Sequence, residues 1–92
     1  MGQVSIRWSE YLKYRADLRG FNLAKIEHII RYSEERYFDT VTQRMVAIGR
    51  HDNVLAMVPY DEEENLLTPI TIHAIRRQQI NFRLKNGRFI HE

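Results

Sequence analysis

The sequence predicts an α+β domain in which two N-terminal helices and one C-terminal helix pack on a small antiparallel sheet of three to four strands. Two early segments carry apolar residues at helical spacing, the middle carries apolar segments separated by polar turns, and a helical pattern returns near the end. A chain of 92 residues has room for one hydrophobic core. We therefore expect a single domain over residues 1–92.

The N-terminal part predicts a short strand followed by two neighbouring helices. The strand is indicated by apolar residues that alternate with polar ones: Val4, Ile6 and Trp8. A helix over about 10–18 begins after Ser9, which can cap it, and ends before Gly20, which can adopt the left-handed conformation. Asn22 caps a second helix that runs to about Tyr32.

The middle of the chain predicts antiparallel strands. The polar segment 39–43 forms a turn before a buried strand at 45–48, and the turn at 51–53 returns the chain as a strand over 54–58. The acidic segment 61–65 is expected to form a solvated hairpin tip.

The last strand and the final helix complete the predicted fold. The strand over 70–74 places alternate residues on opposite faces, with Ile70, Ile72 and Ala74 on one face and Thr71 and His73 on the other. If the helices cover the apolar face, His73 points to the open face. A helix from Arg76 to about Lys85 then ends at Asn86-Gly87.

The charge is distributed unevenly along the chain. In total 14 Lys+Arg stand against 12 Asp+Glu. Residues 1–69 hold nine basic against 11 acidic residues, a charge of −2, whereas residues 70–92 hold five against one, a charge of +4. Arginine outnumbers lysine 11 to 3, and its planar guanidinium can hold phosphate or carboxylate through two hydrogen bonds. An anionic partner for the basic end is one interpretation, and a solvated helix face paired with the acidic segment is the other.

Several classes of function are disfavoured by what the sequence lacks. Without cysteine there is no disulfide, thiolate nucleophile or Cys-ligated metal site. The histidines have no spacing that places two metal ligands on one element, and no glycine-rich loop is present to hold a nucleotide phosphate. We therefore expect no metal and no cofactor. We also expect no membrane association and a cytoplasmic location, because no apolar segment approaches a membrane span and no signal peptide is recognisable.

His73 is the strongest candidate for acid–base chemistry. An imidazole titrates near neutral pH and can act on a ribose 2′-hydroxyl while arginines stabilise the charge that develops on phosphorus. This combination would suit a ribonuclease. The alternative is a surface histidine bonded to a neighbouring strand.

The residues around the final helix supply further candidates. Arg76 and Arg83 project from nearly the same side with Gln79 between them, so all three form a polar ridge that can hold phosphates. We assign catalytic roles to His73, Arg76, Arg83 and Tyr60, and RNA contacts to Arg77, Gln79, Lys85 and Arg88. Tyr60 is included because it ends a central strand, where its hydroxyl can bind a ligand.

The final helix also has apolar residues on two sides. Ile75 and Phe82 lie on one side, and Ile80 and Leu84 lie nearly opposite. One side can pack on the sheet, and the second must be covered by the neighbouring loop, a second copy of the chain or another protein. We favour a partner, with shifted helix boundaries as the alternative.

Two short motifs resemble the BrnT family of toxins. They are Thr71-Ile72-His73-Ala74-Ile75-Arg76-Arg77, where a strand enters a polar helix, and Arg19-Gly20-Phe21-Asn22-Leu23, between the two early helices. The resemblance implies a RelE-like fold and a messenger-RNA-cleaving toxin held inactive by a DNA-binding antitoxin. His73 stands where that family tends to have serine, so its role here is inferred from its own chemistry. A non-catalytic interaction module that retains the fold and uses the final helix is the alternative.

Overall fold

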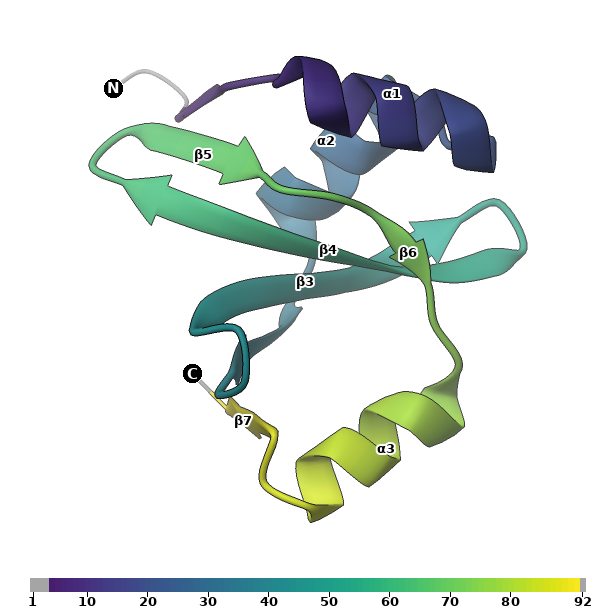
Figure 1. Ribbon diagram of the computed structural model, residues 1–92, viewed down its shortest axis with the longest axis vertical. Coiled ribbons are helices and arrows are strands. Elements are labelled where there is room, and N and C mark those ends of the chain that lie inside the picture. The colour runs from purple at the N-terminus through teal and green to yellow at the C-terminus, as the bar shows by residue number, and fades with distance from the viewer. Residues whose placement is uncertain (1–3, 92) are drawn as a thin grey trace.

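The computed structural model describes residues 4–91 and places three helices around one sheet (Figure 1). The helices are α1 (Glu10–Arg19), α2 (Leu23–Tyr32) and α3 (Arg77–Lys85). The strands are β1 (Ser5–Ile6), β2 (Glu35–Asp39), β3 (Arg44–His51), β4 (Val54–Glu63), β5 (Leu66–Pro69), β6 (His73–Ala74) and β7 (Phe89–His91). The α+β class predicted from the sequence is confirmed.

The two early helices begin and end at the residues that the sequence indicates. The Ser9 hydroxyl accepts a hydrogen bond from the Leu12 amide at 3.1 Å, and the Asn22 side chain accepts one from the Lys25 amide at 3.2 Å. Gly20 ends α1 with φ of 77°, in the left-handed region. These caps keep the link between the two helices short.

The sheet is larger than the predicted three to four strands. Its order is β1-β5-β4-β3-β2-β7, and β6 also pairs with β4. β1 runs parallel to β5, so the sheet is mixed. The prediction is therefore wrong in strand number, because β7 and the division of the return segment add strands to it. Among the described strands the direction is antiparallel as predicted, except for the pairing of β1 with β5.

The segment after the acidic tip also differs from the prediction. β4 continues to Glu63, so most of the expected tip is strand, and the return is divided into β5 and β6 in place of one strand over 70–74. Register pairing with β4 ends at Pro69. The Ile70 amide still donates to the Pro59 carbonyl at 2.8 Å, but Pro59 has no amide hydrogen with which to return the bond. His73 consequently lies on a two-residue strand that pairs with the first half of β4.

Helices cover both faces of the sheet, whereas the sequence predicted that they share one. The sheet divides the buried residues into two clusters, whereas the chain length predicted one core. One core lies under α1 and α2 and includes Leu12, Ile26, Ala47, Val58 and Ile72. A second core lies under α3 and includes Val46, Ile48, Met57, Ile80 and Phe89. β3 and β4 carry apolar residues on both faces, so each face needs a cover. Figure 1 shows α3 across the strands from α1 and α2.

Gly49 in β3 allows α2 to approach the sheet closely. A Cβ atom at this position would lie 2.8 Å from Ile29 Cγ1 and 3.0 Å from Ile29 Cγ2. We expect Gly49→Ala to lower the free energy of unfolding by about 1–3 kcal/mol, because Ile29 is buried and has to move. In an Ile29→Ala background the same change should cost clearly less, since the obstructing atoms are gone. Urea denaturation of the four proteins measures this coupling, and additive effects would contradict it.

Candidate functional site

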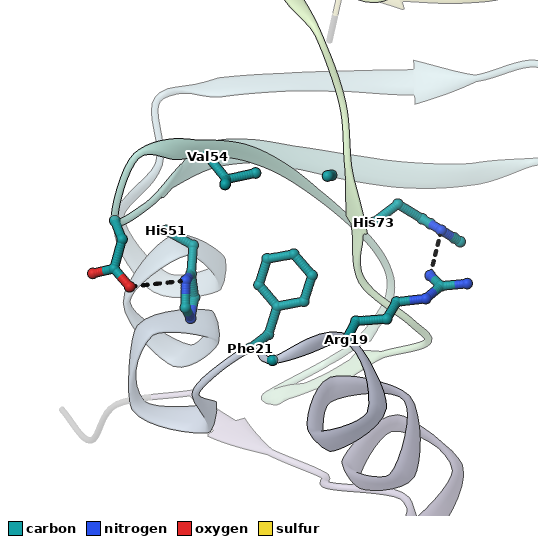
Figure 2. Close-up of a pocket in the computed structure, with 8 residues that line it drawn as sticks. Arg19, Phe21, His51, Val54 and His73 are labelled. Carbon is teal, nitrogen blue, oxygen red and sulfur yellow. Dashed lines mark hydrogen bonds and ion pairs between the residues drawn. The ribbon is translucent and has the colours of Figure 1, made fainter.

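His73 lies at an edge of the sheet, where the end of α1 meets β6. Its register partner on β4 is Met57, so the His73 side chain lies on the α3 face of the sheet. The Arg19 side chain reaches this edge from α1, with Nη1 2.6 Å from His73 Nδ1 and 2.7 Å from the Ile72 carbonyl oxygen. Figure 2 shows the Arg19 and His73 side chains pointing toward one another.

The contact with Arg19 fixes the hydrogen-bonding state of His73. A guanidinium can only donate, so Nδ1 accepts and the proton of the neutral ring is on Nε2. Burial and the positive charges of Arg15 and Arg83 lower the pKa of His73 from its ordinary value of 6.5. At pH 7 the imidazole is therefore neutral and can offer an N–H donor from Nε2.

Arginines approach His73 from two helices. Arg15 and Arg19 lie one turn apart on α1, and Arg83 comes from α3, where its Nη1 lies 3.6 Å from Met57 Sδ. The Arg83 guanidinium also lies over the Phe89 ring, at 5.4 Å from its centre. We call Arg15, Arg19, His73 and Arg83 the edge cluster.

The edge cluster has no carboxylate of its own within residues 4–91. Arg15 donates to the Tyr11 hydroxyl at 3.1 Å, and neither Arg15, Arg19 nor Arg83 forms an ion pair with a described residue. Two buried polar atoms near it also lack a hydrogen-bond partner there, namely Arg15 Nε and Thr71 Oγ1. Three guanidinium groups without a carboxylate partner favour binding of an external anion.

A pocket of about 580 Å³ begins at the edge cluster. Arg19 and His73 line one end, and Phe21, His51 and Val54 line the rest (Figure 2). This volume is typical of small-molecule sites.

His51 is held at the wall of this pocket by the link between α1 and α2. Its Nε2 accepts a hydrogen bond from the Asn22 amide at 2.8 Å, so Nδ1 carries the proton and faces Asp52 Oδ2 at 3.6 Å. The Phe21 ring packs against His51 at right angles, with 4.8 Å between ring centres. His51 thus positions Phe21 and the helix link.

Of the residues assigned catalytic roles, Arg83 is linked to His73 through Met57, because the Arg83 guanidinium contacts Met57 and Met57 is the register partner of His73. Tyr60 is 3 % exposed in the core under α1 and α2, on the opposite face of the sheet, and its hydroxyl accepts a hydrogen bond from Arg36 at 3.0 Å. Arg76 is exposed at the start of α3 and forms no ion pair with a described residue. Tyr60 therefore lies on the opposite face of the sheet from His73 and Arg83.

The residues assigned to RNA contact have mixed surroundings. Arg88 binds the buried Asp39 through two hydrogen bonds of 3.0 Å, and Arg77 pairs with Glu35 at the surface. The Gln79 side chain accepts a hydrogen bond from the Arg76 amide at 2.8 Å and so caps α3. Lys85 is exposed.

A second, smaller pocket lies along α3. It has a volume of about 380 Å³ and is lined by Gln79, Phe82, Arg83 and Arg88 among others. Two residues of the predicted polar ridge, Gln79 and Arg83, therefore line the same pocket. Of the apolar residues on this helix, Ile80 is buried and Phe82 is 65 % exposed.

Sequence reasoning missed Arg15, Arg19, Phe21 and His51 as site residues. Arg15 and Arg19 have a visible signal, since basic residues four apart lie on the same side of a helix. Their approach to His73 depends on a contact between residues 54 positions apart, which no local pattern contains.

Within residues 4–91 no group of three or more His, Asp or Glu side chains could hold a metal ion. None of the helices in that part of the chain is long and apolar enough to cross a membrane.

Comparisons with protein-family models, with curated proteins and with solved structures find no match for this chain. The resemblance to BrnT toxins thus depends on the two short motifs alone. Those motifs meet in the structure, because Arg19 begins the first and His73 lies in the second.

Proposed function

We propose that the protein binds single-stranded RNA at the edge cluster and cleaves it, as a small cytoplasmic ribonuclease toxin of the RelE and BrnT type. The observation that carries this proposal is the group of three arginines without carboxylate partners around a neutral histidine at an open sheet edge. A phosphodiester would accept hydrogen bonds from the guanidinium groups and from His73 Nε2–H.

The proposed reaction is a transesterification within the RNA strand. The ribose 2′-oxygen attacks the adjacent phosphorus, the bond to the 5′-oxygen of the next nucleotide breaks, and the products carry a 2′,3′-cyclic phosphate and a 5′-hydroxyl. When Arg19 turns from His73 to the phosphate, Nδ1 becomes free to accept the 2′-hydroxyl proton. The same proton then passes to the departing 5′-oxygen, while Arg15 and Arg83 stabilise the charge on the phosphorane.

The proposal is tested by incubating the purified protein with messenger RNA, with and without ribosomes, and mapping the cleaved ends. We expect 2′,3′-cyclic phosphate ends in at least one of the two conditions. Intact RNA in both would remove the enzymatic part of the proposal, and lack of binding to single-stranded RNA would remove the whole of it.

His73→Gln should abolish cleavage and also alter the pH dependence of binding. We expect a rate loss of about 100-fold or more, because glutamine cannot exchange a proton.

The pKa of His73 is lowered in the free protein, and a bound phosphate would raise it, so RNA binding is coupled to uptake of a proton by His73. The wild-type affinity should therefore increase as the pH falls from about 7.5 to 5.5, by about 10-fold per unit of pKa difference. RNA affinity measured by fluorescence anisotropy should show no such increase for His73→Gln. If the affinities of the wild type and His73→Gln changed with pH in the same way, His73 would not be the group that takes up the proton.

In the proposed system an antitoxin would neutralise the protein by covering the edge cluster. A neighbouring reading frame that encodes a small DNA-binding protein would support this part of the proposal, and co-expression followed by co-purification would test it.

A second candidate function is a non-catalytic interaction module, and the exposed Phe82 on α3 favours it. A partner protein or a second copy would then cover this part of α3. Light scattering that shows a monomer at high concentration, with no co-purifying protein, would oppose this candidate. Loss of assembly in Phe82→Ser, with RNA cleavage unaffected, would support it.

A further inference from the structure

The pocket beside the edge cluster has two chemically different ends. Arg19 and His73 form the end at which a phosphate would bind. In Figure 2 the Phe21 ring projects between His51 on one side and Arg19 with His73 on the other, below Val54. A ligand that reaches from the phosphate into the pocket would therefore meet an aromatic ring and aliphatic carbon.

The far end of the pocket is unsuited to a second phosphate. Beyond Arg19 and His73, the pocket lining includes the apolar Phe21, Val54 and Ala74 and the carboxylate of Asp52. The hydrogen bond and the positive charge of Lys25 hold the pKa of Asp52 below its ordinary value, so this group is ionised at neutral pH. A flat, uncharged ring with polar edges fits these surroundings, because it can pack on Phe21 and present N–H donors to the rim.

We propose that this pocket holds a nucleobase attached to the phosphate that Arg19 and His73 bind, so that the unit recognised is a nucleotide. This inference rests on the proposed phosphate site and adds a contact to the base. It predicts that the protein binds a nucleotide more tightly than the corresponding sugar phosphate without a base. The edge cluster alone would bind both equally, because it contacts only the phosphate.

The inference is tested first with small ligands in phosphate-free buffer. Isothermal titration calorimetry compares each 5′-nucleoside monophosphate with ribose 5-phosphate, which has the same phosphate and sugar and no base. We expect at least one nucleotide to bind about 10-fold more tightly than ribose 5-phosphate, the size of effect typical for one base packed on one aromatic ring.

Three variants separate the base contact from the phosphate contact. Phe21→Leu removes the aromatic ring but retains apolar volume, and it should abolish the 10-fold margin while leaving ribose 5-phosphate binding unchanged. Ala74→Leu narrows the pocket from an exposed position and should have the same effect. Arg19→Gln should weaken both ligands alike, and Arg7→Gln, a change at an exposed arginine beside Leu67, serves as the control.

A free nucleotide and a nucleotide within RNA offer the same chemistry, and oligoribonucleotides distinguish them. One nucleotide at a time is replaced by an abasic residue, and one position is expected to lose about 10-fold in affinity. RNA binding that no abasic replacement weakens, together with equal affinity for nucleotides and ribose 5-phosphate, would overturn the inference while the proposed RNA function stands. A nucleotide margin that both pocket variants abolish, without any RNA binding, would support the inference and remove the RNA function.

Discussion

Arg88→Met is expected to lower the free energy of unfolding by about 3 kcal/mol, because it leaves a buried carboxylate without its cation. Asp39 is 2 % exposed and receives two hydrogen bonds of 3.0 Å from Arg88. Arg88 retains 30 % side-chain exposure, which places the expected cost at the lower end of the range for buried ion pairs. Urea denaturation monitored by circular dichroism measures the change.

Arg77→Met is the matched control for this variant. Arg77 also pairs with one carboxylate, that of Glu35, but its side chain is 53 % exposed. Exposed ion pairs contribute little, so we expect a loss of no more than about 1 kcal/mol. Equal losses in the two variants would contradict a special role for the Asp39–Arg88 pair.

The same pair predicts how stability depends on pH. Burial raises the pKa of Asp39, but the hydrogen bonds from Arg88 and from backbone amides outweigh it, and the pKa lies below its ordinary value of 3.8. A carboxyl with a lowered pKa stabilises the fold above its unfolded pKa, and this contribution is lost as the pH falls through the folded pKa. In Arg88→Met burial remains and the pKa rises. The stability gap between the two proteins should therefore be largest at neutral pH and narrow as the pH falls through the raised pKa of Asp39 in the variant toward its lowered pKa in the wild type.

The Arg19→Gln, Arg83→Gln double variant should lower affinity for single-stranded RNA by about 100-fold, since each residue would lose a charged hydrogen bond to phosphate. Its salt dependence provides a sharper measurement. A plot of the logarithm of the binding constant against the logarithm of salt concentration should become shallower by about 1.4, because each phosphate contact with a single strand contributes about 0.7.

The control for this prediction removes the same charge elsewhere. Arg7 and Lys13 are exposed, and Lys13 pairs with Glu10 on the first turn of α1. Changing both to glutamine should reduce affinity only slightly and leave the salt slope nearly unchanged. If the salt dependence of the binding constant fell equally in both double variants, RNA affinity would depend on the overall charge of the protein and not on the edge cluster.

The parts of the fold that depend on neighbouring residues could be predicted from the sequence. α1 and α2 follow from the Ser9 and Asn22 caps, and α3 ends where Asn86-Gly87 indicated. β7 could not be predicted, because Phe89–His91 becomes a strand only by pairing with β2, about fifty residues earlier in the chain. The packing of α3 on the face of the sheet opposite α1 and α2 could not be predicted either, because it depends on contacts between residues far apart in the sequence.

The candidate site divides in the same way. The chemistry of His73 and Arg83 could be inferred from residue type and from their places on a strand and a helix. The contribution of α1 could not, because Arg19 reaches His73 only after the sheet has placed β6 beside the end of that helix. Tyr60 was assigned to the site because the sequence predicted a strand end there, but β4 continues to Glu63, and the face to which Tyr60 points depends on register.

The hydrogen bond from Arg19 to the Ile72 carbonyl also has a consequence for solubility. Within the described residues β6 pairs only with β4, so its other side is a free sheet edge of the kind that can recruit a strand from another molecule. Arg19 occupies an acceptor on that edge, and two copies meeting edge to edge would bring six arginines together. The charges proposed to attract RNA therefore also repel other copies of the same protein.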